Sequence, residues 1–166
     1  MMPPNRARLW LIVGGVVLVL AAVALAIFFR SDQVGPGVPA GAMAWYTSDG
    51  GKTWFADTRG KLTPFDHHGE PAYRCYVYSC NDGKTLFVGY LERFTPESRQ
   101  ELEAIMTAKT PPPPDVFEQL STTGVEIALP NTQDWIKATD RRAASVRNPK
   151  CPDGSQQRPI EIFPSE

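Results

Sequence analysis

An uncharged apolar run near the start of the sequence most constrains what this chain can be. Residues 9–29 read LWLIVGGVVLVLAAVALAIFF, which is 21 residues without a charged side chain. A helix of this length would be about 31 Å long, which matches the roughly 30 Å hydrocarbon core of a bilayer. A cleaved signal peptide is the alternative, but its apolar core is usually only about 7–15 residues long. We therefore predict that residues 9–29 form an uncleaved transmembrane helix.

The charges on either side of this run predict its orientation in the membrane. Arg6 and Arg8 precede it, and basic residues favour the cytoplasmic side. Arg30 follows it directly and weakens this bias. The charges still favour residues 1–8 in the cytoplasm and the bulk of the chain outside it.

The composition changes after the apolar run. Residues 30–42 include two prolines and three glycines, which is typical of a tether. Residues 43–166 form the expected extracytoplasmic domain, whose strand pattern is clearest over 43–110 and weaker over 111–166. Because residues 31–166 carry 14 basic and 18 acidic side chains, we expect no nucleic-acid partner.

Two pairs of short runs rich in aromatic and β-branched residues predict β-hairpins. MAWYTS and TWFAD flank a turn at residues 49–52, and AYRCYVYS and TLFVGYLERF flank a second turn at residues 80–84. We expect these four runs to form antiparallel strands of one sheet. Thr95, Pro96 and Glu97 are typical of a helix start, and this helix is expected to cover the sheet. The predicted fold class is therefore α+β.

The first turn has the residues of an Asp-box, the hairpin motif of sialidases and other β-propeller proteins. The match is Thr47-x-Asp49-x-Gly51-x-Thr53-Trp54. In such a turn the Asp49 carboxylate accepts backbone N–H groups, Gly51 adopts a strained conformation, and Trp54 packs inward. In those families the box stabilises a turn away from the catalytic centre, so the resemblance implies a fold element. We expect structural roles in the two turns for Asp49, Gly51, Thr53, Trp54, Asp82 and Gly83.

The second hairpin repeats part of the first and adds a predicted ion pair. Residues 46–55 align with residues 78–87 without gaps, and five positions are identical. Duplication of a hairpin and independent use of the same turn residues both explain this match. Within the second hairpin, Glu92 is expected to pair with Arg74 on the neighbouring strand.

Residues 66–70, with the sequence DHHGE, are the best candidate for a metal site. Asp66, His68 and Glu70 alternate along the chain, and alternate residues of an extended chain share a face. Their side chains are also of the types that bind divalent cations. We favour a solvent-exposed loop without a metal, and we expect no cofactor. A metal-dependent hydrolase that uses these three residues is the alternative function.

The three cysteines allow one disulfide. Cys75 and Cys80 would lie about 16 Å apart along one strand, beyond the roughly 7 Å that a disulfide tolerates. Cys151 is therefore the expected partner of either Cys75 or Cys80. Cys75 alternates with Tyr73 and Val77, which predicts a buried thiol. A free, reactive Cys80 in an exposed turn is the redox alternative.

Fewer elements are predicted in the last third of the chain. The prolines at 111–114 are expected to form an extended spacer after the helix. Residues 124–129 alternate like a strand, and a short helix is expected within residues 134–146. Residues 158–163 are expected to add an edge strand, because prolines bound them.

Three segments carry a resemblance to a known group of proteins. They are residues 46–55 (YTSDGGKTWF), 64–69 (PFDHHG) and 87–96 (FVGYLERFTP). Together they resemble uncharacterised membrane-anchored proteins of planctomycete bacteria. The resemblance implies an amino-terminal anchor and a small outward domain.

These observations predict a single-pass membrane protein of the cell envelope that acts by binding. We expect a non-catalytic interaction or structural subunit with a protein partner in the envelope. Aromatic side chains on the outward face of the sheet would supply the contact surface. Trp45, Tyr76 and Tyr78 are candidates for this role if strand alternation places them on the outward face.

Overall fold

The computed structural model describes residues 42–108 and 114–164. The predicted transmembrane helix at residues 9–29 and nearly all of the predicted tether lie outside this part of the chain. Within the described part, no helix is long and apolar enough to cross a membrane.

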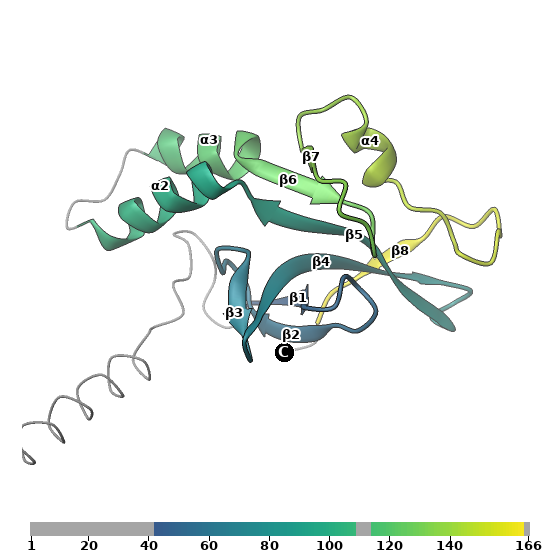
Figure 1. Ribbon diagram of the computed structural model, residues 1–166. Helices are drawn as coiled ribbons and strands as arrows, with labels where there is room; N and C mark the ends of the chain where they lie inside the picture. Colours follow the sequence, from purple (N-terminus) through teal and green to yellow (C-terminus); the bar gives the residue numbers. More distant parts are fainter. Residues whose placement is uncertain (1–41, 109–113, 165–166) are drawn as a thin grey trace, which may run out of the picture. The chain divides into compact units, whose positions relative to one another are not determined.

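Eight antiparallel strands form one sheet in the described part (Figure 1). They are β1 (Met43–Thr47), β2 (Phe55–Thr58), β3 (Phe65–His67), β4 (Glu70–Cys80), β5 (Thr85–Phe94), β6 (Val125–Ala128), β7 (Ile136–Lys137) and β8 (Ile160–Ile162). The main path runs β2-β1-β4-β5-β6-β7, and β3 and β8 each pair with the long strand β4. The predicted antiparallel sheet is therefore confirmed, and it is larger than the two predicted hairpins.

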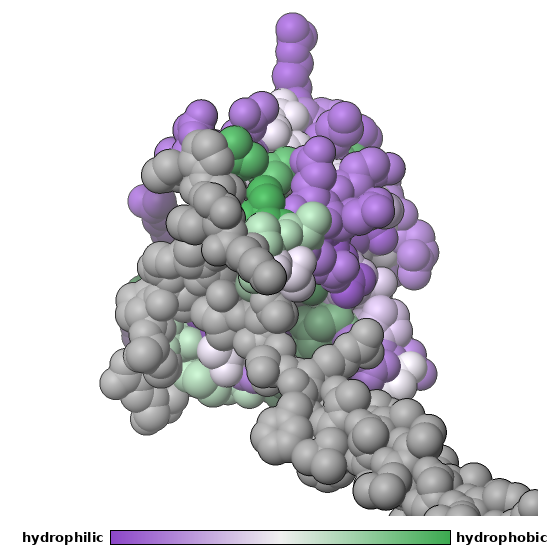
Figure 2. Space-filling view, turned by 90° about the vertical axis from the view of Figure 1, so that its left-hand side faces the viewer, coloured by the Kyte–Doolittle hydropathy of each residue, from purple (hydrophilic) through white to green (hydrophobic). Residues whose placement is uncertain are grey.

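Within residues 42–108 and 114–164, three helices accompany the sheet, namely α2 (Pro96–Thr107), α3 (Pro114–Thr123) and α4 (Ala143–Val146). α2 begins as predicted, because the Thr95 hydroxyl accepts the backbone N–H of Ser98 at 3.2 Å. α2 and α3 pack against each other at the ends of β5 and β6 (Figure 1). The described part of the chain therefore has a few helices beside the sheet, where one covering helix was predicted. Figure 2 shows the molecule from the left-hand side of Figure 1, with apolar side chains among hydrophilic ones at the height of these two helices.

Two further segments differ from the sequence-based expectation. Pro114, expected to end an extended spacer, is the first residue of α3. Proline suits this position because the first N–H groups of a helix have no partner within the helix. The helix predicted within residues 134–146 is reduced to α4, because Ile136 instead pairs with Ile127 of β6.

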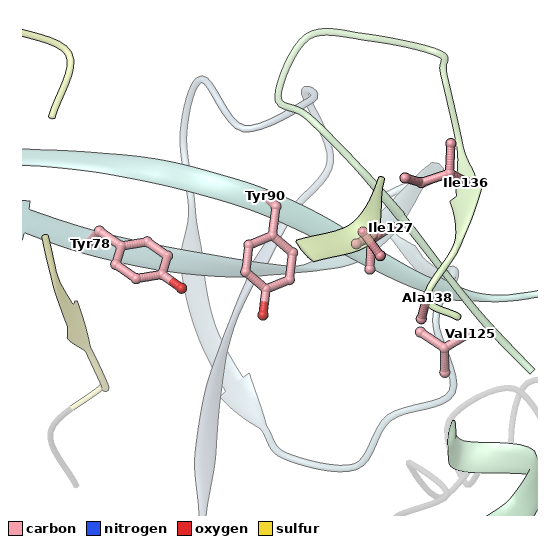
Figure 3. Close-up of a cluster of buried hydrophobic side chains, with 7 residues drawn as sticks. Tyr78, Tyr90, Val125, Ile127, Ile136 and Ala138 are labelled. Carbon is pink, nitrogen blue, oxygen red and sulfur yellow. The ribbon is translucent and has the colours of Figure 1, made fainter. Parts of the chain in front are cut away.

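The two faces of the sheet bury separate apolar clusters. Successive side chains of β4 point to opposite faces, so Val77 belongs to one cluster and Tyr78 to the other. The tryptophan cluster consists of Cys75, Val77, Val88 and Leu91, with Trp45, Trp54 and Trp135 packed against them. The tyrosine cluster consists of Tyr78, Tyr90, Val125, Ile127, Ile136, Ala138 and Ala143 (Figure 3). β4 is therefore covered on both faces.

The two hairpins that align in sequence also share a register. Tyr46 lies opposite Phe55 in the first hairpin, and Tyr78 lies opposite Phe87 in the second. The ring centroids are 6.1 Å apart in both pairs. The sequence match therefore corresponds to a match in backbone pairing.

Candidate functional site

The turn between β1 and β2 is held by the carboxylate of Asp49. Its Oδ1 accepts the backbone N–H groups of Lys52 and Thr53 at 3.0 Å, and its Oδ2 accepts the Thr53 hydroxyl at 2.7 Å. The Thr47 hydroxyl donates to Asp49 Oδ1 at 2.9 Å and accepts the N–H of Gly51 at 3.0 Å. Gly51 has a φ of +95°, a conformation that favours glycine. The polar residues of the Asp-box-like segment thus stabilise their own turn.

Asp49 should make the stability of the domain depend on pH. Burial alone would raise the pKa of this carboxyl, but hydrogen bonds from Thr53, Thr47 and Lys52 outweigh it and lower the pKa well below its usual value. The folded state therefore binds this proton more weakly than the unfolded state does. The resulting stabilisation is complete above about pH 4 and is lost as the pH falls below that value.

We expect Asp49→Asn to lower the free energy of unfolding by about 1 kcal/mol at neutral pH, the usual cost of losing a capping side chain. The difference from the unchanged protein should narrow below about pH 4. Urea denaturation at neutral and acid pH measures both effects. Asp82→Asn, in the exposed turn of the second hairpin, is the matched control. A difference that does not change with pH would contradict the role given to Asp49.

The segment predicted as a metal site is a tight hairpin between β3 and β4. His68 and Gly69 form its turn, and His68 has a φ of +56°. This turn breaks the alternation that would have placed Asp66, His68 and Glu70 on one face. All three are exposed, and among the described residues no group of three His, Cys, Asp or Glu side chains is placed to hold a metal ion. The three residues on which the hydrolase alternative depends therefore do not form a metal-binding group in the described part of the chain.

The aromatic residues predicted as a contact surface are used in packing. Tyr78 is only 9% exposed and belongs to the tyrosine cluster, so its predicted exposure is wrong. The Tyr76 ring stacks on Tyr90 with a centroid distance of 4.2 Å. Trp45 packs against the tryptophan cluster, and its indole N–H donates to the Ile162 carbonyl at 2.9 Å. Strand alternation does not separate buried from exposed side chains here, because both faces of β4 are covered.

Arg74, Tyr76 and Glu92 form a polar network on β4 and β5. Arg74 lies directly opposite Glu92, with Nη1 and Oε1 3.6 Å apart, so the predicted cross-strand pair is confirmed. The Tyr76 hydroxyl donates to Glu92 Oε2 at 3.0 Å, and the Arg74 guanidinium lies 4.8 Å from the Tyr76 ring centroid. Burial and the Glu92 carboxylate raise the pKa of Tyr76, so the phenol stays protonated. Since these groups satisfy one another, the network favours a structural role.

A shallow pocket lies where β1 and β8 approach the same edge of β4. The other edge is occupied by β5, so β1 pairs at Arg74 and β8 pairs from Val77 onward. Between these pairs the strands separate, and the volume of about 20 Å³ is room for a water molecule rather than for a substrate. The lining residues include Met43, Trp45, Arg59, Arg74, Glu161 and Phe163.

Four large apolar side chains are exposed in the described part of the chain, and the sequence analysis did not identify them. Ile160 is 68% exposed, Phe163 is 66% exposed, and Leu86 and Leu129 are each 49% exposed. Ile160 and Leu86 both lie opposite Ser79 of β4, so they share a face of the sheet. Phe163 follows β8 at the opposite parity to Ile160, so it does not share this face. The sequence feature that could have identified Ile160 and Phe163 is the short apolar segment between Pro159 and Pro164.

Cys80 and Cys151 form a disulfide, which decides between the two predicted pairings. Cys75 is the buried free thiol that was predicted, and burial raises its pKa to about 12. The redox alternative with a free Cys80 is wrong. The disulfide joins the end of β4 to the segment before β8, where the Asn81 N–H also donates to Gln157 Oε1 at 3.2 Å.

Comparison with protein families, with curated proteins and with solved structures finds no match for this chain. No residue role is therefore carried over from another protein. The case for a function rests on the side chains described above.

Proposed function

We propose that residues 9–29 anchor this protein in a membrane and that residues 43–166 lie outside the cytoplasm. There the domain acts as a non-catalytic interaction or structural subunit of the cell envelope, while residues 1–8 remain in the cytoplasm. The resemblance to membrane-anchored planctomycete proteins supports the same arrangement.

The disulfide between Cys80 and Cys151 is the observation that carries this proposal. Disulfides persist in oxidising compartments and are rare in the reducing cytosol. Both cysteines are nearly inaccessible, at 3% and 4% exposed, as is typical of a structural bond. A disulfide-bonded domain that follows an apolar run of membrane-spanning length fits a single-pass protein whose domain lies on the oxidising side.

The described side chains favour binding over chemistry. Glu92 is engaged by Tyr76 and Arg74, and burial keeps the Cys75 thiol protonated. These groups are therefore poorly placed to act on a substrate. In contrast, Leu86 and Ile160 are exposed on one face of the sheet, where they flank Ser79 of β4.

Alkaline carbonate extraction of membranes tests the anchor. We expect the full chain to stay in the membrane pellet, with a mature amino terminus that begins before residue 9. A variant with Leu18→Arg and Leu20→Arg is the control, since each charge at a span centre costs about 2.5–3.5 kcal/mol of insertion free energy. Release of the unchanged chain, or a mature terminus beyond residue 29, would contradict the proposal.

A further inference from the structure

Aspartate precedes glycine in three turns of the described part of the chain, namely Asp49–Gly50, Asp82–Gly83 and Asp153–Gly154. A glycine in the second position favours cyclisation, because its nitrogen can reach the preceding side-chain carboxyl carbon without hindrance from a Cβ. We propose that Asp82 is a site of spontaneous isoaspartate formation and that local hydrogen bonds protect Asp49 and Asp153 from the same reaction. The inference goes beyond the proposed function and does not depend on it.

The reaction needs only these residues and water. The Gly83 nitrogen attacks Cγ of the protonated Asp82 carboxyl group, and the amide hydrogen leaves with the carboxyl OH as a water molecule. The product is a five-membered succinimide ring. A second water molecule then adds to the main-chain carbonyl carbon of Asp82 and breaks its bond to the Gly83 nitrogen. The chain is left joined through Cβ and Cγ, its mass is unchanged, and nothing is oxidised or reduced.

The turn between β4 and β5 leaves Asp82 free to react. This turn closes the end of the long hairpin, and Asp82 and Gly83 are both exposed in it (Figure 1). Within residues 42–108 and 114–164, the Asp82 carboxylate makes no hydrogen bond or ion pair, and no hydrogen bond of a turn or loop uses the Gly83 N–H. Asp82 has a φ of +54°, and Asp49 and Asp153 are not among the residues with a positive φ. This left-handed conformation is unfavourable for a residue with a Cβ, so it favours opening of the turn.

Asp49 is held by the hydrogen bonds of its own turn. Its carboxylate accepts the N–H groups of Lys52 and Thr53 at 3.0 Å and the Thr53 hydroxyl at 2.7 Å. Cγ of Asp49 cannot turn toward the Gly50 nitrogen until these bonds break. Burial raises the pKa of Asp49, but the hydrogen bonds outweigh it and lower the pKa, which depletes the protonated carboxyl group that the reaction uses.

Asp153 is held at both of its reacting groups. Its Oδ1 accepts the Ser155 N–H at 2.9 Å, and its Oδ2 accepts the side-chain amide of Asn81. These two bonds lower the pKa of Asp153. The Gly154 N–H, which would supply the nucleophile, donates to the Cys151 carbonyl at 3.1 Å. We therefore expect Asp153 to react slowly although it is exposed.

The isoaspartate product at Asp82 should remain folded. Cys80 of β4 lies opposite Thr85 of β5, so strand pairing closes directly beside the turn. The extra main-chain atom disturbs the hydrogen bond from the Lys84 N–H to the Asn81 carbonyl, which is 3.2 Å long, but it separates no strand pair. The product should therefore accumulate in the folded protein.

Incubation of the purified full chain in detergent micelles and heavy-oxygen water tests this inference. Each succinimide that opens takes one oxygen atom from the solvent, so fragment-ion mass spectrometry counts the events at each aspartate and identifies isoaspartate. At neutral pH, Asp82 should gain about tenfold more heavy oxygen than Asp49 or Asp153, because hydrogen bonds must break before the other two can react. In urea the three sites should react at similar rates, since each is followed by glycine.

Two variants supply the controls. Asp82→Glu keeps the charge but requires a less favourable six-membered ring, so it should remove most of the label at position 82. Thr53→Ala removes a hydrogen bond to Asp49 and should increase the label at Asp49 several-fold without changing that at Asp82. Equal labelling of the three aspartates in the folded chain would overturn the inference, and so would labelling of Asp82 that appears only in urea. An unchanged rate at Asp49 in Thr53→Ala would contradict the protection assigned to its hydrogen bonds.

Discussion

Replacing both Cys80 and Cys151 by serine is expected to lower the free energy of unfolding by about 4 kcal/mol. The disulfide joins residues 71 apart, and a crosslink over that length removes a corresponding amount of entropy from the unfolded chain. The segment that it holds leads into β8, so hydrogen exchange should increase first in that strand. Urea denaturation of the full chain in detergent micelles, followed by tryptophan fluorescence, measures the loss.

The third cysteine supplies the control for this experiment. Cys75→Ala removes a buried thiol but no crosslink, and we expect it to cost about 1 kcal/mol. Reduction of the unchanged protein should reproduce the double-serine variant. A double variant as stable as the oxidised protein would show that the disulfide does not stabilise the domain.

Gly89→Ala is expected to lower the free energy of unfolding by about 2–3 kcal/mol. Gly89 is the extra residue where the register of β5 shifts against β4. An added Cβ would lie 2.6 Å from two ring carbons of Tyr78 and 2.9 Å from Cγ of Pro149. The Tyr78 ring cannot retreat without disturbing the tyrosine cluster that contains it. The same urea denaturation of the full chain measures this loss.

Two comparisons separate this steric clash from other causes. Gly69→Ala adds a Cβ with no atom within 4 Å and leaves only the strain of a φ of +88°, which costs about 1 kcal/mol. In a double-mutant cycle, Gly89→Ala should cost less when Tyr78→Ala has removed the ring. An equal cost in both backgrounds would show that the Tyr78 ring is not the source of the clash.

Features that depend on neighbouring residues were predictable from the sequence. Alternating side chains and turn residues place the two hairpins, and the contacts of Asp49 are all made within its own turn. The start of α2 follows from Thr95, whose hydroxyl accepts an N–H group only three residues along the chain, in the first turn of the helix. In each case the interacting groups are too close in the chain for tertiary packing to override them.

Features that depend on distant residues were not predictable in the same way. Cys151 had two possible partners until the fold placed the segment before β8 beside Cys80, at the end of β4. Tyr78 was expected to be exposed, but elements on both faces of the sheet bury β4. The exposure of Ile160 likewise depends on which edge of β4 pairs with β8. Pro114 was grouped with the prolines before it, although proline is also typical of the first residue of a helix.

Cysteine labelling in intact cells tests most directly the claim that the disulfide-bonded domain lies outside the cytoplasm. An impermeant maleimide should label a Lys52→Cys variant in intact cells, because Lys52 is exposed in the turn between β1 and β2. After acid quenching and unfolding, Cys80 and Cys151 should react only once they are reduced, whereas Cys75 should react without reduction. Labelling of position 52 only once the membrane is permeabilised, with Cys80 and Cys151 as free thiols, would place the domain in the cytoplasm and contradict this account.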